Sequence, residues 1–155
     1  MANMSIISSA FTEGETIPAR FTCKGLNFSP PLTWFNLPSG TTSMALICED
    51  PDAPSGVFVH WVLYNIPFTI NDLPEGIPQT QQVPGMGTHG VNDFQHAGYD
   101  GPCPPPGKPH RYIFILFALD METSLPQGWR SNQLQSRIKP HTLGTAQLMG
   151  TFHRI

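Results

Sequence analysis

The stretch that decides the fold reads GYDGPCPPPGKPHRY over residues 98–112 and continues as IFILFAL over residues 113–119. The first part is rich in proline and glycine, which favour turns and stiff loops. The second part, counted from Tyr112 to Leu119, is an apolar run of eight residues. Its length and its phenylalanine and isoleucine content predict a strand that is buried on both faces. The loop therefore delivers His110 and Tyr112 to the mouth of a buried strand, where polar groups can line a pocket.

An earlier stretch has a similar organisation. It reads DPDAP over residues 50–54 and is followed by HWVLY over residues 60–64. Alternation of side chains along a strand places Asp50 and Asp52 on one side, where both can face a partner such as His60. If the two stretches meet in space, two carboxylates and two imidazoles share one cavity.

The remaining strand signals are short segments of apolar, β-branched or alternating residues. They lie at residues 5–8, 32–34, 44–48, 57–64 and 145–152. One helix is predicted over residues 129–139, and Pro140 should end it. Residues 69–99 form a long connection between strands. Many strands and one late helix indicate a mainly β, antiparallel architecture with a minor helical element.

Length and charge bound the class of protein. The chain has 155 residues, so we expect residues 1–155 to form a single domain. The net charge is −3 without a run of Lys or Arg, and this excludes the basic surface that binds nucleic acid. No apolar run approaches the roughly 18 residues of a membrane-spanning helix, and the first residues do not resemble a secretory signal. We expect a cytoplasmic protein with no segment inserted in a membrane.

The cysteines and histidines raise two further interpretations. The three cysteines Cys23, Cys48 and Cys103 form no CxxC pair, so we expect reduced thiols and no structural zinc. Asp and His are zinc or iron ligands, but their spacing here forms no helical HxxxH motif, so no metal is expected. Cys103 is close in sequence to His110, and a Cys–His pair can act as a nucleophile. Neither an orienting partner nor an oxyanion hole is recognisable in the sequence.

Each candidate site residue also has an ordinary structural explanation. An Asp-Pro-Asp sequence at residues 50–52 is common turn chemistry. Single strand histidines such as His60 and His110 are usually satisfied core residues, and Tyr112 is first a packing residue. Two histidines that each adjoin a Gly/Pro loop favour a site. A nearby carboxylate favours the protonated imidazole, and a cation beside glycine N–H groups forms a small anion site.

The two stretches together resemble the signatures of the phosphatidylethanolamine-binding protein family, also called the Raf kinase inhibitor protein family. Residues 50–54 with His60 and Trp61 resemble the first signature, and residues 98–112 resemble the second. The sequence GVNDF at residues 90–94 is similar to a Gly-x-Asn-Asp segment of bacterial members. Further similarity lies in the sequences FTCKG at residues 21–25, SPPL at 29–32 and GTF at 150–152. The resemblance therefore covers nearly the whole chain and is closest to the bacterial and archaeal branch.

This resemblance implies an antiparallel β-sandwich-like fold with one or two short helices. It also implies a non-enzymatic binding protein without a cofactor, whose pocket takes a small anion such as phosphate or the phosphoethanolamine head group of a phospholipid. By matching positions, the pocket residues are Asp50, Asp52, His60, Gly101, Pro102, Pro105, His110 and Tyr112. The family further implies a regulator that binds a protein kinase or another protein, and bacterial relatives imply a homodimer.

Two departures from the family pattern affect the pocket mouth. The loop at residues 101–107 carries Cys103 and a third proline, where animal members have a shorter loop. The carboxy-terminal extension that covers the pocket in animal members is not expected here. The shape of the mouth and the choice of partner should therefore differ. The alternative function is a hydrolytic enzyme in which His60 or His110 is the general acid or base and Cys103 or water attacks.

Overall fold

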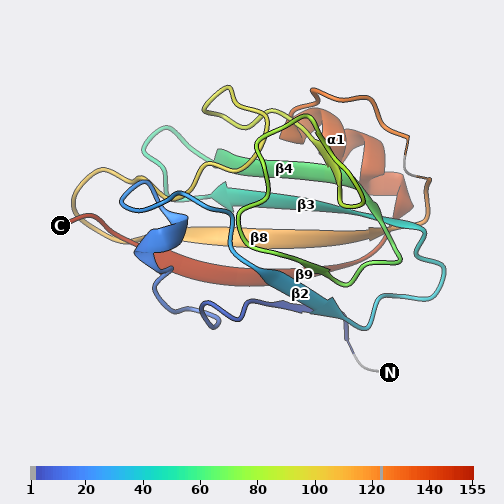
Figure 1. Ribbon diagram of the computed structural model, residues 1–155, viewed down its shortest axis with the longest axis horizontal. Helices are drawn as coiled ribbons and strands as arrows, with labels where there is room; N and C mark the ends of the chain where they lie inside the picture. Colours follow the sequence, from blue (N-terminus) through green and yellow to red (C-terminus); the bar gives the residue numbers. More distant parts are fainter. Residues whose placement is uncertain (1–2, 123) are drawn as a thin grey trace.

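Strand β3 (Ser43–Asp50) lies inside the larger sheet, and its central residues 44–48 are all apolar. All of its residues except Glu49 are buried. It pairs antiparallel with β4 (Phe58–Pro67) on one side and with β8 (His110–Leu119) on the other (Figure 1). The strand predicted from Tyr112 to Leu119 is thus confirmed and begins two residues earlier.

The structure is a computed structural model that describes residues 3–122 and 124–155. Over these residues it contains a six-stranded sheet in the order β6-β7-β4-β3-β8-β9 and a three-stranded sheet in the order β1-β2-β5. The other strands are β1 (Ser5–Ile7), β2 (Leu32–Phe35), β5 (Asp72–Leu73), β6 (Gln82–Val83), β7 (Gly87–His89) and β9 (Thr142–Phe152). All strand pairs in both sheets are antiparallel. The predicted mainly β, antiparallel fold is confirmed.

The helical content is small, as the proline-rich composition predicts. Among the described residues there is one α-helix, α1 (Ser131–Ile138), and two short 3-10 turns, Ala19–Phe21 and Lys139–His141. The helix lies within the predicted range 129–139 and is shorter at both ends. Pro140 falls in the 3-10 turn that leads into β9. No helix of the described residues is long and apolar enough to cross a membrane.

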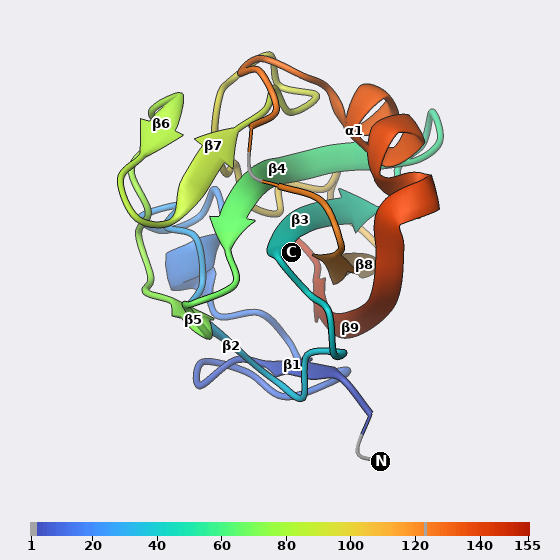
Figure 2. The same cartoon turned by 90° about the vertical axis from the view of Figure 1, so that its right-hand side faces the viewer.

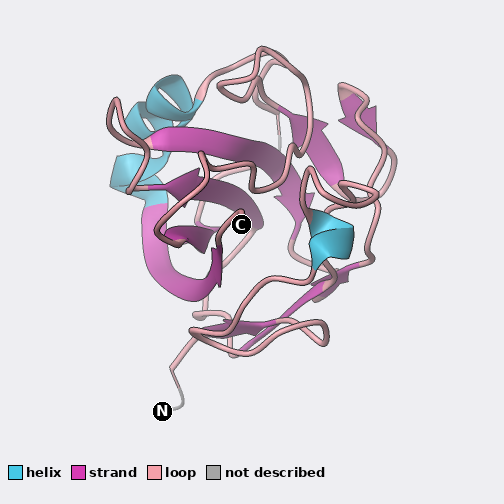
Figure 3. Ribbon diagram, turned by 90° about the vertical axis from the view of Figure 1, so that its left-hand side faces the viewer, coloured by secondary structure: helices cyan, strands magenta, loops and turns pink. Residues whose placement is uncertain are grey.

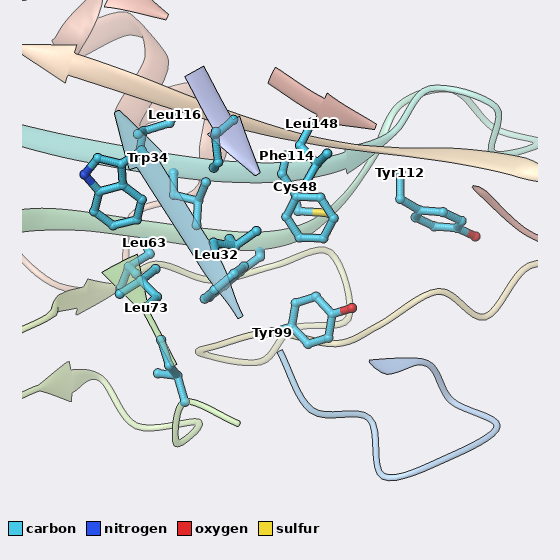
Figure 4. Close-up of a cluster of buried hydrophobic side chains, with 14 of the residues drawn as sticks. Leu32, Trp34, Cys48, Leu63, Leu73, Tyr99, Tyr112, Phe114, Leu116 and Leu148 are labelled. Carbon is cyan, nitrogen blue, oxygen red and sulfur yellow. The ribbon is translucent and has the colours of Figure 1, made fainter. Parts of the chain in front are cut away.

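The larger sheet is covered on both faces, which explains why β3 is a continuous apolar run rather than an alternating one. Met44, Leu46 and Cys48 belong to the core cluster that also contains Trp34 of the smaller sheet (Figure 4). Ala45 and Ile47, which point to the opposite face, pack in a second cluster with Leu134 and Ile138 of α1. Successive strand residues point to opposite faces, so each face of β3 meets a different layer (Figure 2).

The long connection at residues 69–99 is ordered and contributes β5, β6 and β7 to the two sheets. A buried histidine holds it against β4. Nε2 of His89 accepts a hydrogen bond from the Trp61 indole at 3.0 Å, and Nδ1 donates to the carbonyl oxygen of Thr80 at 2.7 Å. Both ring nitrogens are therefore satisfied by a neutral imidazole. Burial lowers the pKa of His89, and the Thr80 carbonyl opposes this shift only in part.

The expectation of three reduced cysteines is wrong in this structure. Cys23 and Cys103 form a disulfide across a sequence separation of 80 residues, with their Cα atoms 5.4 Å apart. Cys48 is a free, buried cysteine. The disulfide links the segment after the first 3-10 turn to the proline-rich loop before β8. The sequence spacing did not indicate this pair because the fold alone brings the two loops together.

Candidate functional site

The candidate site is a cavity at the end of the larger sheet where β3 ends and both β4 and β8 begin. The loops at this end face the viewer in Figure 3. The cavity volume is about 160 Å³, and the lining residues are Asp50, Ala53, Pro54, Phe58, His60, Phe94, Cys103, Pro104, Pro105, His110 and Tyr112. This volume is about five times that of a water molecule in the liquid, so the cavity admits a small polyatomic group.

Asp50 and His110 meet at the cavity from adjacent strands. Asp50 is the last residue of β3 and His110 is the first residue of β8, so antiparallel pairing places them at the same end. Oδ2 of Asp50 lies 2.6 Å from Nδ1 of His110. Oδ1 of Asp50 accepts a second hydrogen bond, 2.7 Å long, from the backbone N–H of Asp52. The carboxylate is thereby oriented by the turn that follows β3, and it orients the imidazole in turn.

His60 projects from β4 and is held in one tautomer. Its Nδ1 lies 2.7 Å from the backbone carbonyl oxygen of Asp100. Because a carbonyl oxygen only accepts hydrogen bonds, Nδ1 carries a proton and Nε2 is the nitrogen left for the cavity. Burial lowers the pKa of His60, and the Asp100 carbonyl and the negative charge of Asp50 oppose the shift only in part. The neutral ring, with a lone pair on Nε2, is the favoured state.

Tyr112 brings a phenol to the same cavity. It lies one strand period after His110, so both side chains are on the same side of β8. Its hydroxyl group is buried and lies near the Asp50 carboxylate, but it makes no hydrogen bond of good geometry to a described residue. In Figure 4 this hydroxyl points away from the other labelled core side chains. Burial, assisted by the negative charge of Asp50, raises the pKa of Tyr112 well above its usual value, so the phenol keeps its proton and can donate a hydrogen bond to a ligand.

Two phenylalanines complete an aromatic wall that the sequence analysis did not include. Phe58 and Phe94 pack edge to face, with 4.8 Å between ring centroids, and each also contacts the His60 ring. Phe58 precedes His60 by two residues on β4, so strand alternation could have identified it. Phe94 comes from the long connection, and no local pattern assigns it to the cavity. Its side of the mouth is partly open to solvent.

Asp52 does not line the cavity, although alternation placed it beside Asp50 in the sequence analysis. Strand β3 ends at Asp50, and the following turn directs Asp52 outward. There it accepts hydrogen bonds from the backbone N–H and the side chain of Arg111, at 2.8–2.9 Å. These bonds lower the pKa of Asp52 to about 2. The pair ties the turn after β3 to the start of β8 and so supports the cavity from outside.

Gly101 and Pro102 lie behind the wall that Cys103, Pro104 and Pro105 form. The backbone N–H of Gly101 donates to Oδ1 of Asn27, and a Cβ at this position would overlap the carbonyl oxygen of Phe21. The carbonyl oxygen of Pro102 accepts from the backbone N–H of Cys23. Of the eight expected site residues, the structure brings five to the cavity. These are Asp50, His60, Pro105, His110 and Tyr112.

A buried asparagine organises the loops around the site. The side-chain amide of Asn92 donates to the carbonyl oxygen of Gly98 at 2.9 Å and to Oδ2 of Asp100 at 2.8 Å. Its side-chain oxygen accepts from the backbone N–H of Phe94. The same residue therefore fixes the loop that supplies Phe94 and the loop whose carbonyl group orients His60. The GVNDF segment contributes to the site through this support.

The arrangement limits the chemistry of the cavity. Among residues 3–122 and 124–155, no group of three or more His, Cys, Asp or Glu side chains is placed to hold a metal ion. Cys103 is part of the disulfide, so it has no thiol for nucleophilic attack in this form. The cavity therefore offers one carboxylate, two imidazoles and one phenol within apolar walls.

The comparisons with known proteins agree with the sequence signatures. A family model described as phosphatidylethanolamine-binding protein matches residues 7–153. A UPF0098 protein of Methanothermobacter thermautotrophicus is 44% identical over 151 residues, which cover 97% of this chain and 99% of that protein. A UPF0098 protein of Aquifex aeolicus is 42% identical and is covered over 90% of its length, with 99% of this chain aligned.

Solved structures show the same fold. A crystal structure described as a putative phosphatidylethanolamine-binding protein homolog from Chlamydia trachomatis superposes with a TM-score of 0.90 at 36% identity, over 100% of both chains. Escherichia coli YbcL, described as a new member of the mammalian family of such proteins, superposes with a TM-score of 0.91 at 32% identity. That match covers 99% of this chain and 100% of YbcL.

Proposed function

The chain belongs to the phosphatidylethanolamine-binding protein family, and from this premise we propose that it is a non-enzymatic protein that binds a small oxyanion in the cavity beside Asp50, His60, His110 and Tyr112. The bound group is a phosphate-like group, either free or as part of a larger ligand. The remainder of such a ligand would extend out of the cavity through the mouth between Phe94 and the proline-rich loop.

The observation that carries the proposal is the buried Tyr112 hydroxyl group. It makes no hydrogen bond of good geometry to a described residue, yet it belongs to a side chain that lines the cavity. A buried donor without a well-formed hydrogen bond is unfavourable, and the nearby Asp50 carboxylate does not supply one of good geometry, so an acceptor oxygen of a ligand in the cavity would be favoured. His60 and His110 line the same cavity, and each ring makes its short hydrogen bond, to Asp100 or Asp50, through Nδ1. The phenol and the two imidazoles supply polar contacts, and the aromatic and proline side chains form apolar walls.

The test is an NMR titration of the unmodified protein and of His60→Ala with phosphate, phosphoethanolamine and acetate. We expect saturable chemical-shift changes at residues around the cavity in the unmodified protein and their loss in the variant. His153→Ala is the matched control, because His153 is exposed and lies outside the cavity lining. Retained phosphate affinity in a folded His60→Ala protein would contradict the proposal.

The Asp50–His110 pair supports a second candidate function, a hydrolase. A carboxylate that orients an imidazole is the arrangement by which a histidine becomes a general base. With Cys103 in the disulfide, water rather than a thiol would attack. A screen of phosphate and carboxylate esters would separate the two functions, since turnover that disappears in His110→Ala favours the hydrolase.

Binding to a protein kinase or another protein, and assembly into a homodimer, stay predictions of the family resemblance. A pull-down with the unmodified protein tests the first. Light scattering of the purified protein tests the second. A positive result in either experiment involves the anion cavity only if the His60→Ala variant changes that result.

A further inference from the structure

We propose that the cavity selects an oxyanion that carries its own acidic proton, such as a phosphomonoester monoanion, over an oxyanion of the same shape and charge without that proton, such as a sulfate monoester. This inference rests on the proposed anion-binding function and names its ligand class. It follows from the balance of hydrogen-bond donors and acceptors in the cavity lining.

The first acceptor is Asp50. Its two oxygens accept hydrogen bonds from the Asp52 N–H and from Nδ1 of His110, which is the pattern of a carboxylate. An ionised carboxylate has about four acceptor positions and no donor. Acceptor capacity therefore remains on the wall of the cavity. An anion that presents only lone pairs to this wall meets a like charge and no donor.

The second acceptor is Nε2 of His60. The hydrogen bond to the Asp100 carbonyl holds the proton on Nδ1, so Nε2 of the neutral ring carries a lone pair. The polar groups around this ring are the carboxylates of Asp50 and Asp100, the phenol of Tyr112, and the backbone groups of Asp100 and Gly101. Phe58 and Phe94 contact the ring as well. His110 lies on the same cavity wall. A ligand O–H can donate to this nitrogen, whereas a deprotonated oxygen cannot.

The cavity lining offers fewer hydrogen-bond donors than acceptors. The Tyr112 hydroxyl group can donate to an anionic oxygen, and Nε2 of His110 can do so when that ring is protonated. A phosphomonoester monoanion has both an O–H group and anionic oxygens, so it can satisfy the acceptors and the donors together. A sulfate monoester has the same single charge and three terminal oxygens, but none of them carries a proton.

The chemical difference between these ligands is therefore one proton. The second ionisation of a phosphomonoester has a pKa of about 6, so at about pH 6 half of the population is the monoanion. Leaving a buried acceptor unpaired weakens binding by about tenfold or more. We expect at least this ratio between the affinities of a phosphate ester monoanion and its sulfate analogue.

The experiment is a calorimetric or NMR titration of the unmodified protein at about pH 6 with three probes. The probes are phosphoethanolamine, ethanolamine O-sulfate and glycerophosphoethanolamine, a phosphodiester without an acidic proton. We expect phosphoethanolamine to bind at least about tenfold more tightly than the other two. Equal affinity for the sulfate ester or for the diester overturns the inference and leaves anion binding intact. No binding of any probe overturns the proposed function itself, and the inference with it.

Two variants locate the selectivity. Asp50→Asn replaces an acceptor oxygen by an amide donor, so the phosphate-to-sulfate ratio should fall towards one. Asp120→Asn is the matched control, because Asp120 also pairs with a histidine, His141 at 2.9 Å, and does not line the cavity. The control should keep the ratio of the unmodified protein. An unchanged phosphate-to-sulfate ratio in a folded Asp50→Asn protein overturns the role of Asp50. If that variant does not fold, the comparison of the three probes on the unmodified protein decides the inference.

Discussion

The carboxylate of Asp50 lies 2.6 Å from Nδ1 of His110, although 60 residues separate them along the chain. Both side chains are largely buried, and the contact joins the end of β3 to the beginning of β8. The loops that enclose the cavity start or finish at these two residues. The pair is thus both a wall of the site and a link between the two central strands.

Removal of the imidazole should therefore destabilise the protein. His110→Ala leaves the Asp50 carboxylate buried with one hydrogen bond fewer, and breaking such a pair lowers the free energy of unfolding by about 3 kcal/mol. Urea denaturation measures this change. Lys108→Ala, an exposed change in the same loop, is the control and should stay within about 0.5 kcal/mol of the unmodified protein. A His110→Ala protein as stable as the control would show that the pair has no net effect on stability.

Acid should destabilise the protein through its buried histidines. Burial lowers the folded-state pKa of His60 and His89 below the ordinary value of 6.5, so the unfolded chain binds protons first as the pH falls. The free energy of unfolding should therefore be constant above about pH 7.5 and decrease below about pH 6.5, by up to about 1.4 kcal/mol per pH unit for each group. Thermal denaturation across this range measures the slope.

Single substitutions show which histidine causes this pH dependence of the free energy of unfolding. His89→Gln keeps a donor and an acceptor but does not titrate, so its pH dependence should be shallower than that of the unmodified protein. His153→Gln changes an exposed histidine and should leave the dependence unchanged. Identical slopes in all three proteins would mean that His89 does not contribute to the loss of stability in acid.

The Cys23–Cys103 disulfide should contribute to stability, because it closes a loop of 80 residues. A constraint of this kind typically stabilises a protein by about 2–4 kcal/mol. Cys103→Ser should show this loss in urea denaturation. Dithiothreitol should destabilise the unmodified protein to the same extent and have no effect on the variant. Insensitivity of the unmodified protein to reduction, with its thiols shown to be free, would contradict the prediction.

The ion pair between Asp52 and Arg111 should contribute less to stability than the disulfide, because the Arg111 side chain is about half exposed. Asp52→Asn should lower the free energy of unfolding by less than about 1 kcal/mol near neutral pH. The hydrogen bonds to Arg111 lower the pKa of Asp52 to about 2. This contribution is therefore complete above the ordinary aspartate range and is lost as the pH falls towards about 2. Comparison of the variant with the unmodified protein at neutral and acid pH measures it, and a larger effect at acid pH would contradict the assignment.

The central strands could be predicted from sequence because their signal is local. The apolar residues 113–119 and the β-branched segment before Tyr64 need two covered faces wherever they lie, so their strand character does not depend on the partner. The same local logic placed His60, His110 and Tyr112 at strand positions next to stiff loops. The long connection at residues 69–99 lacked such a signal because its placement depends on tertiary contacts such as the hydrogen bond between His89 and Trp61 of β4.

The sequence by itself determined the antiparallel β class, the two loop-and-strand signatures and the residue types of the cavity, because these depend on patterns within a few residues. The tertiary structure alone decided which groups meet. It turned Asp52 away to Arg111, brought Phe94 into the wall and joined Cys23 to Cys103. The physical reason is that strand periodicity ends where the strand ends, so contacts beyond that point are set by how the sheets and loops pack.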